Sequence, residues 1–275
     1  MKFLCVAFLL FIFLCCSQPY HNGVNMGLIT KSGNTLIHRI GLPTGYTRVA
    51  GDSTSFTYFL RSQKLKPDSA QVHLYNGEVK RNDVHAAVLD IDCGKKDLQQ
   101  CADACIRLRA EYLWHTRQFE KIHFNLTNGF RMGYTKWREG NRLIVDGNKT
   151  SWSKTAAYSD TYQTFRNYLD KVFMYAGTLS VAKELKPVLL ADLHPGDVFV
   201  VGGSPGHAVM VVDVATHADG NKIFLLAQGY MPAQDIHIIK NPNDELLSPW
   251  YSLKDGDALE TMEWTFQNYT LGRFE

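Results

Sequence analysis

The last third of the chain contains four short apolar runs, and they constrain the fold more than any other feature. They read GDVFVVGG, GHAVMVVDVA, KIFLLAQG and DIHIIKN, and all four fall between residues 196 and 241. Runs of this length, rich in Val and Ile and separated by Gly, Pro, Asn and Asp, are typical of buried β-strands. Short connections between successive strands favour antiparallel pairing. We therefore expect an antiparallel sheet in this part of the chain.

Two longer stretches before these runs show the spacing of helices. A long helix is expected from about residue 97 to residue 114, and a second fits residues 159–178, where Phe165, Leu169 and Val172 form one apolar stripe. A short third helix is predicted for residues 179–185. Helices followed by antiparallel strands indicate the α+β class. We expect residues 31–275 to form a single domain of this class.

Other segments give weaker signals. Residues 34–50 read as a strand, a Pro-Gly turn and another strand, residues 53–65 as a helix, and Asn76-Gly77 as the turn of a hairpin before a buried strand over residues 85–92. The stretch around residues 120–155 is rich in aromatic residues, Asn and Gly. It predicts a loop-rich insertion, of the kind that often lines a site.

The amino terminus has the features of an export signal. One Lys precedes a run of fourteen apolar residues, Phe3 to Cys16, which is short for a membrane span and suits a signal. We expect residues 1–16 to be this signal and residues 17–30 a flexible tether. The Cys15-Cys16 pair resembles the cleavage box of bacterial lipoproteins, with Cys16, or else Cys15, lipidated. Such a protein is exported, either periplasmic or attached to the membrane through its lipid only; plain secretion and a retained anchor are the alternatives.

Composition argues against several kinds of partner. The net charge is +2, on 29 basic and 27 acidic residues that form no blocks, which is no electrostatic footprint for nucleic acid. No Cys and His spacing of a zinc site occurs, so we expect neither a metal nor a cofactor. We expect a monomer.

Three cysteines follow the expected signal, namely Cys93, Cys101 and Cys105. Exported chains usually pair their thiols, and an odd number leaves at least one over. Cys101 and Cys105 lie one helical turn apart, a spacing that strains a disulfide inside a regular helix. A disulfide from Cys93 to either of them stays open at this point.

Cys101 occupies a position that suits a nucleophilic thiol. Asp97 and Gln100 form a capping-box pattern, which predicts Asp97 as the N-cap and places Cys101 in the first helical turn. Free backbone N–H groups and the helix dipole favour a thiolate there, whereas Cys105 is better suited to the core. The backbone N–H of Cys101 and the amide of Gln99 or Gln100 are natural oxyanion donors. The alternative interpretation of Cys101 is a buried filler or half of a disulfide.

A thiol nucleophile needs a base, and His207, at the start of a predicted strand, is the best candidate. A third group would orient its imidazole, and the chain offers Asp213, Gln228 and Asp235. Asp213 is excluded because it lies about 20 Å along the same strand, at about 3.3 Å per residue. Gln228 lies about 13 Å along the sheet from His207 if the preceding turn has two residues, and about 7 Å if the loop spans residues 217–220. We favour Gln228.

The order of these features resembles the papain-like amidases and peptidases of bacterial cell walls, the NlpC-type and CHAP-type families. In those families a Cys at a helix N-terminus precedes a strand that opens with PGD, and the catalytic His begins the next strand. Cys101, the PGD of residues 195–197 and His207 match this order. The chain departs from the pattern in its QQCADAC segment and in the 106 residues between Cys and His, which require an insertion. The resemblance implies a papain-like fold with helices packed on an antiparallel sheet.

A closer resemblance covers most of the chain after the signal. LQQCADACIRLRAEYL, GGSPGHAVMVVD and LLAQGYMPAQDIHI are similar to an uncharacterised bacterial family, a domain of unknown function in exported proteins and lipoproteins. These resemblances lead us to expect a cell-envelope thiol hydrolase with Cys101 as nucleophile, His207 as base and Gln228 as the group that holds the imidazole. The expected partner is a cell-wall peptide or glycan, first of all a peptidoglycan stem peptide. The alternative is a non-catalytic envelope lipoprotein that uses the same scaffold for binding or assembly.

Overall fold

A central antiparallel sheet organises the protein, as the apolar runs predict. The computed structural model describes residues 27–275, so the predicted signal and the lipidation site Cys16 lie outside the described residues. Eight strands form the sheet, in the order β2 (His85–Val88), β11 (His237–Ile239), β10 (Lys222–Gln228), β9 (His207–His217), β8 (Asp197–Val201), β14 (Thr270–Arg273) and β7 (Lys186–Pro187), with β1 (Tyr46–Arg48) paired to the far end of β9. All of these pairings are antiparallel.

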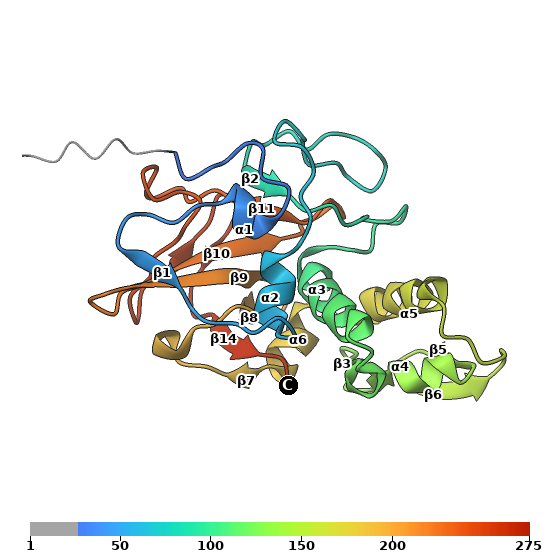
Figure 1. The fold of residues 1–275 in the computed structure, drawn as a ribbon. Helices are drawn as coiled ribbons and strands as arrows, with labels where there is room; N and C mark the ends of the chain where they lie inside the picture. Colours follow the sequence, from blue (N-terminus) through green and yellow to red (C-terminus); the bar gives the residue numbers. More distant parts are fainter. Residues whose placement is uncertain (1–26) are drawn as a thin grey trace, which may run out of the picture.

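Helices and small ribbons surround this sheet (Figure 1). The helices are α1 (Leu36–Arg39), α2 (Phe56–Arg61), α3 (Cys101–His115), α4 (Tyr134–Arg138), α5 (Tyr162–Tyr175) and α6 (Thr178–Glu184), with 3₁₀ turns at Phe119–Lys121 and Leu190–Asp192. Three two-stranded ribbons are β3 (His123–Asn125) with β4 (Arg131–Gly133), β5 (Asn141–Asp146) with β6 (Lys149–Lys154), and β12 (Leu259–Glu260) with β13 (Thr265–Phe266). The α+β class is therefore confirmed.

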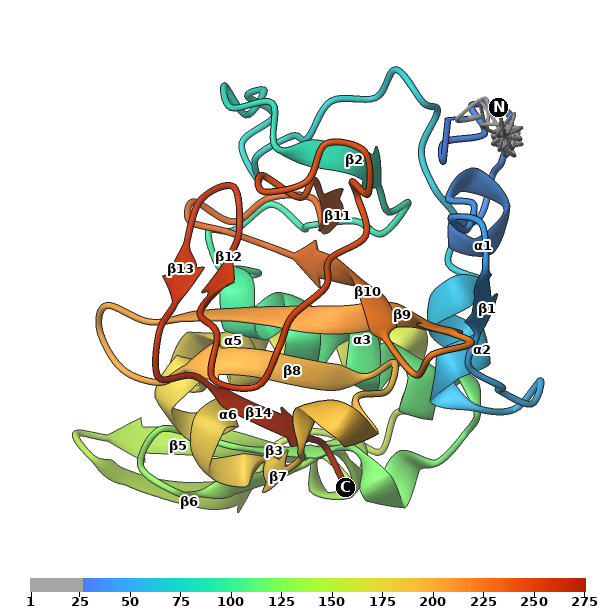
Figure 2. The ribbon, with the colours of Figure 1, turned by 90° about the vertical axis from the view of Figure 1, so that its left-hand side faces the viewer.

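Each face of the sheet carries its own hydrophobic core. Figure 2 shows strands β10, β9 and β8 running across the view, with α3 and α5 behind them and β12 and β13 on the nearer side. Met210 and Val212 of β9 belong to the core on the helix side, whereas Val209 and Val211 pack with Phe266 of β13 in the other. Because successive side chains of a strand alternate between faces, a strand with two buried faces is apolar throughout. This explains the continuous apolar run of β9.

Two local predictions are wrong. Residues 34–40 were expected as a strand, but they contain the one-turn helix α1, which buries Leu36 and is followed directly by the buried Ile40. Residues four apart share one face of a helix, so this turn lets both side chains reach the core. The expected tether also extends too far, since Ile29 pairs with Ile40 in an antiparallel bridge.

The expected loop-rich insertion around residues 120–155 is instead mostly regular structure. It holds β3, β4, α4, β5 and β6. Tyr134 and Trp137, at 0% and 4% exposure, pack into the main core. Aromatic residues supply enough apolar area to fix such short elements against α5. Among residues 27–275, no helix combines the length and apolar character needed to cross a membrane.

Candidate active site

Cys101 is the first residue of α3, closer to the helix end than the sequence pattern predicts. The N-cap is Gln100, whose backbone N–H donates to Asp103 Oδ2 at 3.0 Å. The prediction of Asp97 as N-cap is wrong, because a turn in which the Gln100 N–H donates to the Leu98 carbonyl separates Asp97 from the helix. Asp97 Oδ1 instead accepts from the backbone N–H of Ala233 at 2.7 Å.

The Cys101 thiol borders a cavity of about 740 Å³. Residues from several segments surround it, among them Asp103, Thr178, Gly206 and Trp264. The thiol is 7% exposed, and the backbone N–H groups of Ala102 and Ala208 lie within hydrogen-bonding reach of it. Ala208 follows His207 in β9, so the nucleophile candidate lies at the start of that strand.

The expectation of an ionised thiolate at this helix end is not met. Burial, and next the charge of Asp103, raise the pKa of the Cys101 thiol, although the neighbouring backbone N–H groups act in the opposite direction. Cys105 is completely buried, as expected for a core residue. Cys93, Cys101 and Cys105 are all free, so no disulfide joins them.

His207 lies at the start of β9, where close packing leaves no room for a side chain on the preceding residue. A Cβ atom at Gly206 would lie 2.5 Å from the carbonyl oxygen of Gly203 and 2.5 Å from Thr178 Oγ1. The chain therefore needs glycine at this position. His207 itself is 2% exposed, and burial lowers its pKa to about 4. The imidazole is therefore neutral at physiological pH.

Aromatic rings enclose His207. Its ring centroid lies 5.0 Å from that of Tyr230 and 5.5 Å from those of Trp264 and Phe266. Trp264 also lines the Cys101 cavity. Burial raises the pKa of Tyr230, and the charges of Glu263 and of an ionised Cys101 raise it further. Trp264 is thus a neighbour of the imidazole and also borders the cavity at Cys101.

The structure brings the predicted third residue, Gln228, into contact with His207. His207 Nε2 donates to Gln228 Oε1 at 3.0 Å. This contact depends on a register shift between β9 and β10, where Leu225 faces Asp213 but Leu226 faces Val211. Beyond this shift, the pairing of Ala227 with Met210 places Gln228 opposite Val209. Of the two registers considered from the sequence, this is the one that brings Gln228 nearer to His207. A β-bulge produces that register, whereas the sequence analysis attributed it to a four-residue loop.

Two further groups fix which way the Gln228 amide points. Gln228 Nε2 donates to Glu263 Oε2 at 3.0 Å and to His237 Nε2 at 3.2 Å. His237 Nε2 is free to accept because its Nδ1 donates to the Asp235 carbonyl at 2.9 Å. With the NH₂ group so engaged, only Oε1 faces His207, which therefore carries its proton on Nε2. Nδ1 of His207 is left as the basic nitrogen.

The two glutamines expected as oxyanion donors bind elsewhere. Gln99 is 1% exposed and its Oε1 accepts from Arg107 Nη1 at 2.7 Å. Gln100 Nε2 donates to Asp97 Oδ1 at 3.1 Å. Neither hydrogen bond is directed at the thiol, because Gln99 precedes the helix in a turn that points its side chain toward Arg107. The available donors near Cys101 are backbone N–H groups.

The other two candidates for the third residue, Asp213 and Asp235, have structural partners. Asp213 accepts from Arg48 and Arg61, each at 2.6 Å. Asp235 accepts from Lys66 Nζ at 2.8 Å. Within residues 27–275, no group of three or more His, Cys, Asp or Glu side chains could hold a metal ion.

Sequence reasoning missed Glu263, which holds Gln228 and forms an ion pair of 2.7 Å with Lys80. It also missed Tyr230, Trp264 and Asp103. Glu263 and Trp264 come from the ribbon of β12 and β13, whose short strands carry no clear hydrophobic alternation. Nothing in the local sequence around Glu263 distinguishes it from an ordinary surface carboxylate.

Comparison with known proteins places the chain in a family. Residues 36–273 match the family described as "Domain of unknown function (4846)". No curated protein matches the chain significantly. No solved structure does so either. Because the match spans nearly all of the described residues, the chain belongs to the domain of unknown function (4846) family.

Proposed function

We propose that this protein is an exported thiol hydrolase of the cell envelope that cleaves amide bonds, with peptidoglycan stem peptides or related peptides as substrates. The observation that carries the proposal is the hydrogen bond from His207 to Gln228, beside the cavity that Cys101 borders. The papain-like, exported and lipoprotein parts of the proposal rest on sequence resemblance. The choice of base rests on the His207–Gln228 hydrogen bond, and the choice of nucleophile rests on the cavity that Cys101 borders.

The proposed reaction begins with a neutral pair. Cys101 is protonated and His207 is unprotonated at neutral pH, because burial disfavours both charged forms. Cys101 Sγ attacks the amide carbonyl while His207 Nδ1 takes the thiol proton, and the imidazolium then gives this proton to the leaving amine. Water hydrolyses the resulting thioester, with His207 again as the base. The backbone N–H groups of Ala102 and Ala208 favour the ionised form of the thiol.

The Gln228 network keeps the base in the form that this reaction needs. A neutral imidazole has two tautomers, and only the one with the proton on Nε2 leaves Nδ1 free. Gln228 Oε1 accepts a hydrogen bond from that N–H group, and Glu263 prevents the amide from turning over. Loss of this support would leave the imidazole free to adopt the unreactive tautomer.

A second candidate function is the non-catalytic one, a binding or assembly module of the envelope. The burial of Cys101 and the raised pKa of its thiol favour it, because such a thiol is inert until the site changes. The two functions make different predictions for one experiment.

That experiment incubates purified protein with peptidoglycan and identifies the products by mass spectrometry. A hydrolase releases fragments that carry a new amine and a new carboxylate. Cys101→Ala and His207→Ala are each expected to lower the rate about a thousandfold or more, whereas Cys93→Ala, which removes a thiol outside the Cys101 cavity, keeps it.

The non-catalytic function predicts no products from any variant. It is supported further if iodoacetamide modifies Cys101 only as the protein unfolds. A rate that survives in Cys101→Ala rejects the proposed nucleophile. A rate that survives in His207→Ala rejects the proposed base.

A further inference from the structure

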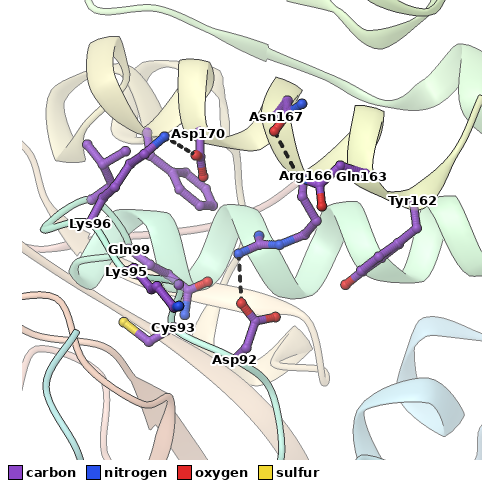
Figure 3. Close-up of a pocket in the computed structure, with 13 residues that line it drawn as sticks. Asp92, Cys93, Lys95, Lys96, Gln99, Tyr162, Gln163, Arg166, Asn167 and Asp170 are labelled. Atoms are coloured by element: carbon purple, nitrogen blue, oxygen red, sulfur yellow. Dashed lines mark hydrogen bonds and ion pairs between the residues drawn. The ribbon is translucent and has the colours of Figure 1, made fainter. Parts of the chain in front are cut away.

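A second cavity lies behind the segment that leads into α3. It measures about 410 Å³ and lies between residues 92–99 and α5 (Figure 3). Leu98 and Phe173 line both this cavity and the one at Cys101, so the two are neighbours. Three cationic side chains and two carboxylates line it, which leaves one positive charge in excess: Lys95, Lys96, Arg166, Asp92 and Asp170.

Gln99 lines this cavity with an amide NH₂ group that has no partner. Its Oε1 accepts from Arg107 Nη1 at 2.7 Å, so the orientation of the amide is fixed. Its Nε2 is buried and makes no hydrogen bond. An unsatisfied buried donor is costly, and natural proteins keep few of them. The geometry therefore calls for an acceptor at this place.

Arg166 of α5 also has a buried N–H donor without a partner. Its Nη2 donates to Asp92 Oδ1 at 3.2 Å, while its Nη1 is buried without a partner. The second oxygen of Asp92 is occupied as well, since Arg107 Nη2 lies 3.1 Å from it. The nearest carboxylate thus has both of its oxygens engaged. Two orphaned donors, meaning buried N–H groups without an acceptor, therefore lie in this cavity, one on each wall: Gln99 Nε2 and Arg166 Nη1.

We propose that this cavity binds a monocarboxylate, with one oxygen accepting from Gln99 Nε2 and the other from Arg166 Nη1. A carboxylate offers only acceptors, on two oxygens, which matches the number and kind of unpartnered donors in this cavity. Its single charge offsets the excess positive charge of the lining. Phosphate carries more charge and needs more donors than the two orphans supply.

An exposed ion pair connects the two walls of this cavity. Lys96 Nζ lies 2.8 Å from Asp170 Oδ2 and joins the two walls, with side chains 68% and 28% exposed. Ion pairs this exposed contribute about 0–1 kcal/mol, so opening the pair costs little. The orphaned donors are covered in this conformation, and the ligand reaches them when this pair opens.

The test compares two probes that differ only in charge, N-acetylglycine and its neutral amide. Binding is followed by titration calorimetry for every variant, and in the variants that keep Gln99 also by its side-chain amide resonance in ¹⁵N-labelled protein. The wild type is expected to bind N-acetylglycine and to ignore the amide. Arg166→Gln and Gln99→Leu each weaken binding about tenfold or more. Lys171→Gln removes the same charge from α5 outside the cavity lining and leaves binding unchanged.

Four outcomes would overturn the proposal: equal binding of both probes, no binding of N-acetylglycine, binding that Arg166→Gln leaves intact, or preference for inorganic phosphate. Because Gln99 is fully buried, thermal unfolding first establishes that its variant folds; if it does not, Arg166→Gln decides. The measurement is repeated in Cys101→Ala. Binding there is expected to equal that of the wild type, so this proposal stands or falls independently of hydrolysis.

Discussion

Acid should destabilise this protein in a way that can be assigned to His207. The pKa of His207 is lowered from 6.5 to about 4 in the folded state by burial. Between these values the unfolded chain binds a proton that the folded protein does not. The contribution of His207 to stability is therefore complete above pH 6.5 and is lost as the pH falls toward about 4. At about 1.4 kcal/mol per pKa unit, it amounts to about 3 kcal/mol.

The assay is urea unfolding over this pH range, with the free energy of unfolding extrapolated to water at each pH. His207→Gln lacks the titrating group, so its stability should fall by about 3 kcal/mol less than that of the wild type between neutral pH and about pH 4. His115→Gln removes an exposed histidine and should follow the wild type. If the wild type and His207→Gln show the same pH dependence, His207 is not held as a buried neutral base, and the reasoning is refuted.

Two further predictions concern buried aspartates. Asp103→Asn keeps an oxygen that can cap α3 but removes a charge that raises the pKa of Cys101, so iodoacetamide should modify Cys101 at lower pH than in the wild type; an unchanged or higher midpoint would contradict this. Asp213→Ala leaves Arg48 and Arg61 without their shared carboxylate and should cost about 3–5 kcal/mol of unfolding free energy, measured by urea at neutral pH. A loss below about 1 kcal/mol would mean that water replaces this carboxylate.

Regular elements could be predicted from the sequence because their patterns are local. The strands β8, β9, β10 and β11 and the helices α3, α5 and α6 all lie where apolar spacing places them. The short helix α1 could not be predicted in this way. Leu36 and Ile40 suit a strand as well as a helix, and only the position of the core selects between them.

The candidate site was predictable only where chain position determines side-chain position. His207 and Gln228 could be paired because strand registers are few, whereas the partners of Gln99 depend on where Arg107 lies in three dimensions. Glu263 comes from a distant ribbon, and no spacing rule connects it to β10. The thiol pKa was predicted in the wrong direction because helix position is visible in the sequence and burial is not.

Because of the bulge between β9 and β10, the contact between His207 and Gln228 depends on the number of residues in these strands. One extra residue in β9 shifts its pairing with β10, and His207 meets Gln228 in the register beyond that shift. Deleting Val212 would remove the bulge but keep the pairings on both sides of it, Leu225 with Asp213 and Leu226 with Val211, so His207 and Gln228 should still meet. Among relatives of this chain, a one-residue insertion or deletion between the bulge and His207, or between the bulge and Gln228, should therefore accompany the loss of the His-Gln pair, whereas loss of the bulge residue alone can be tolerated.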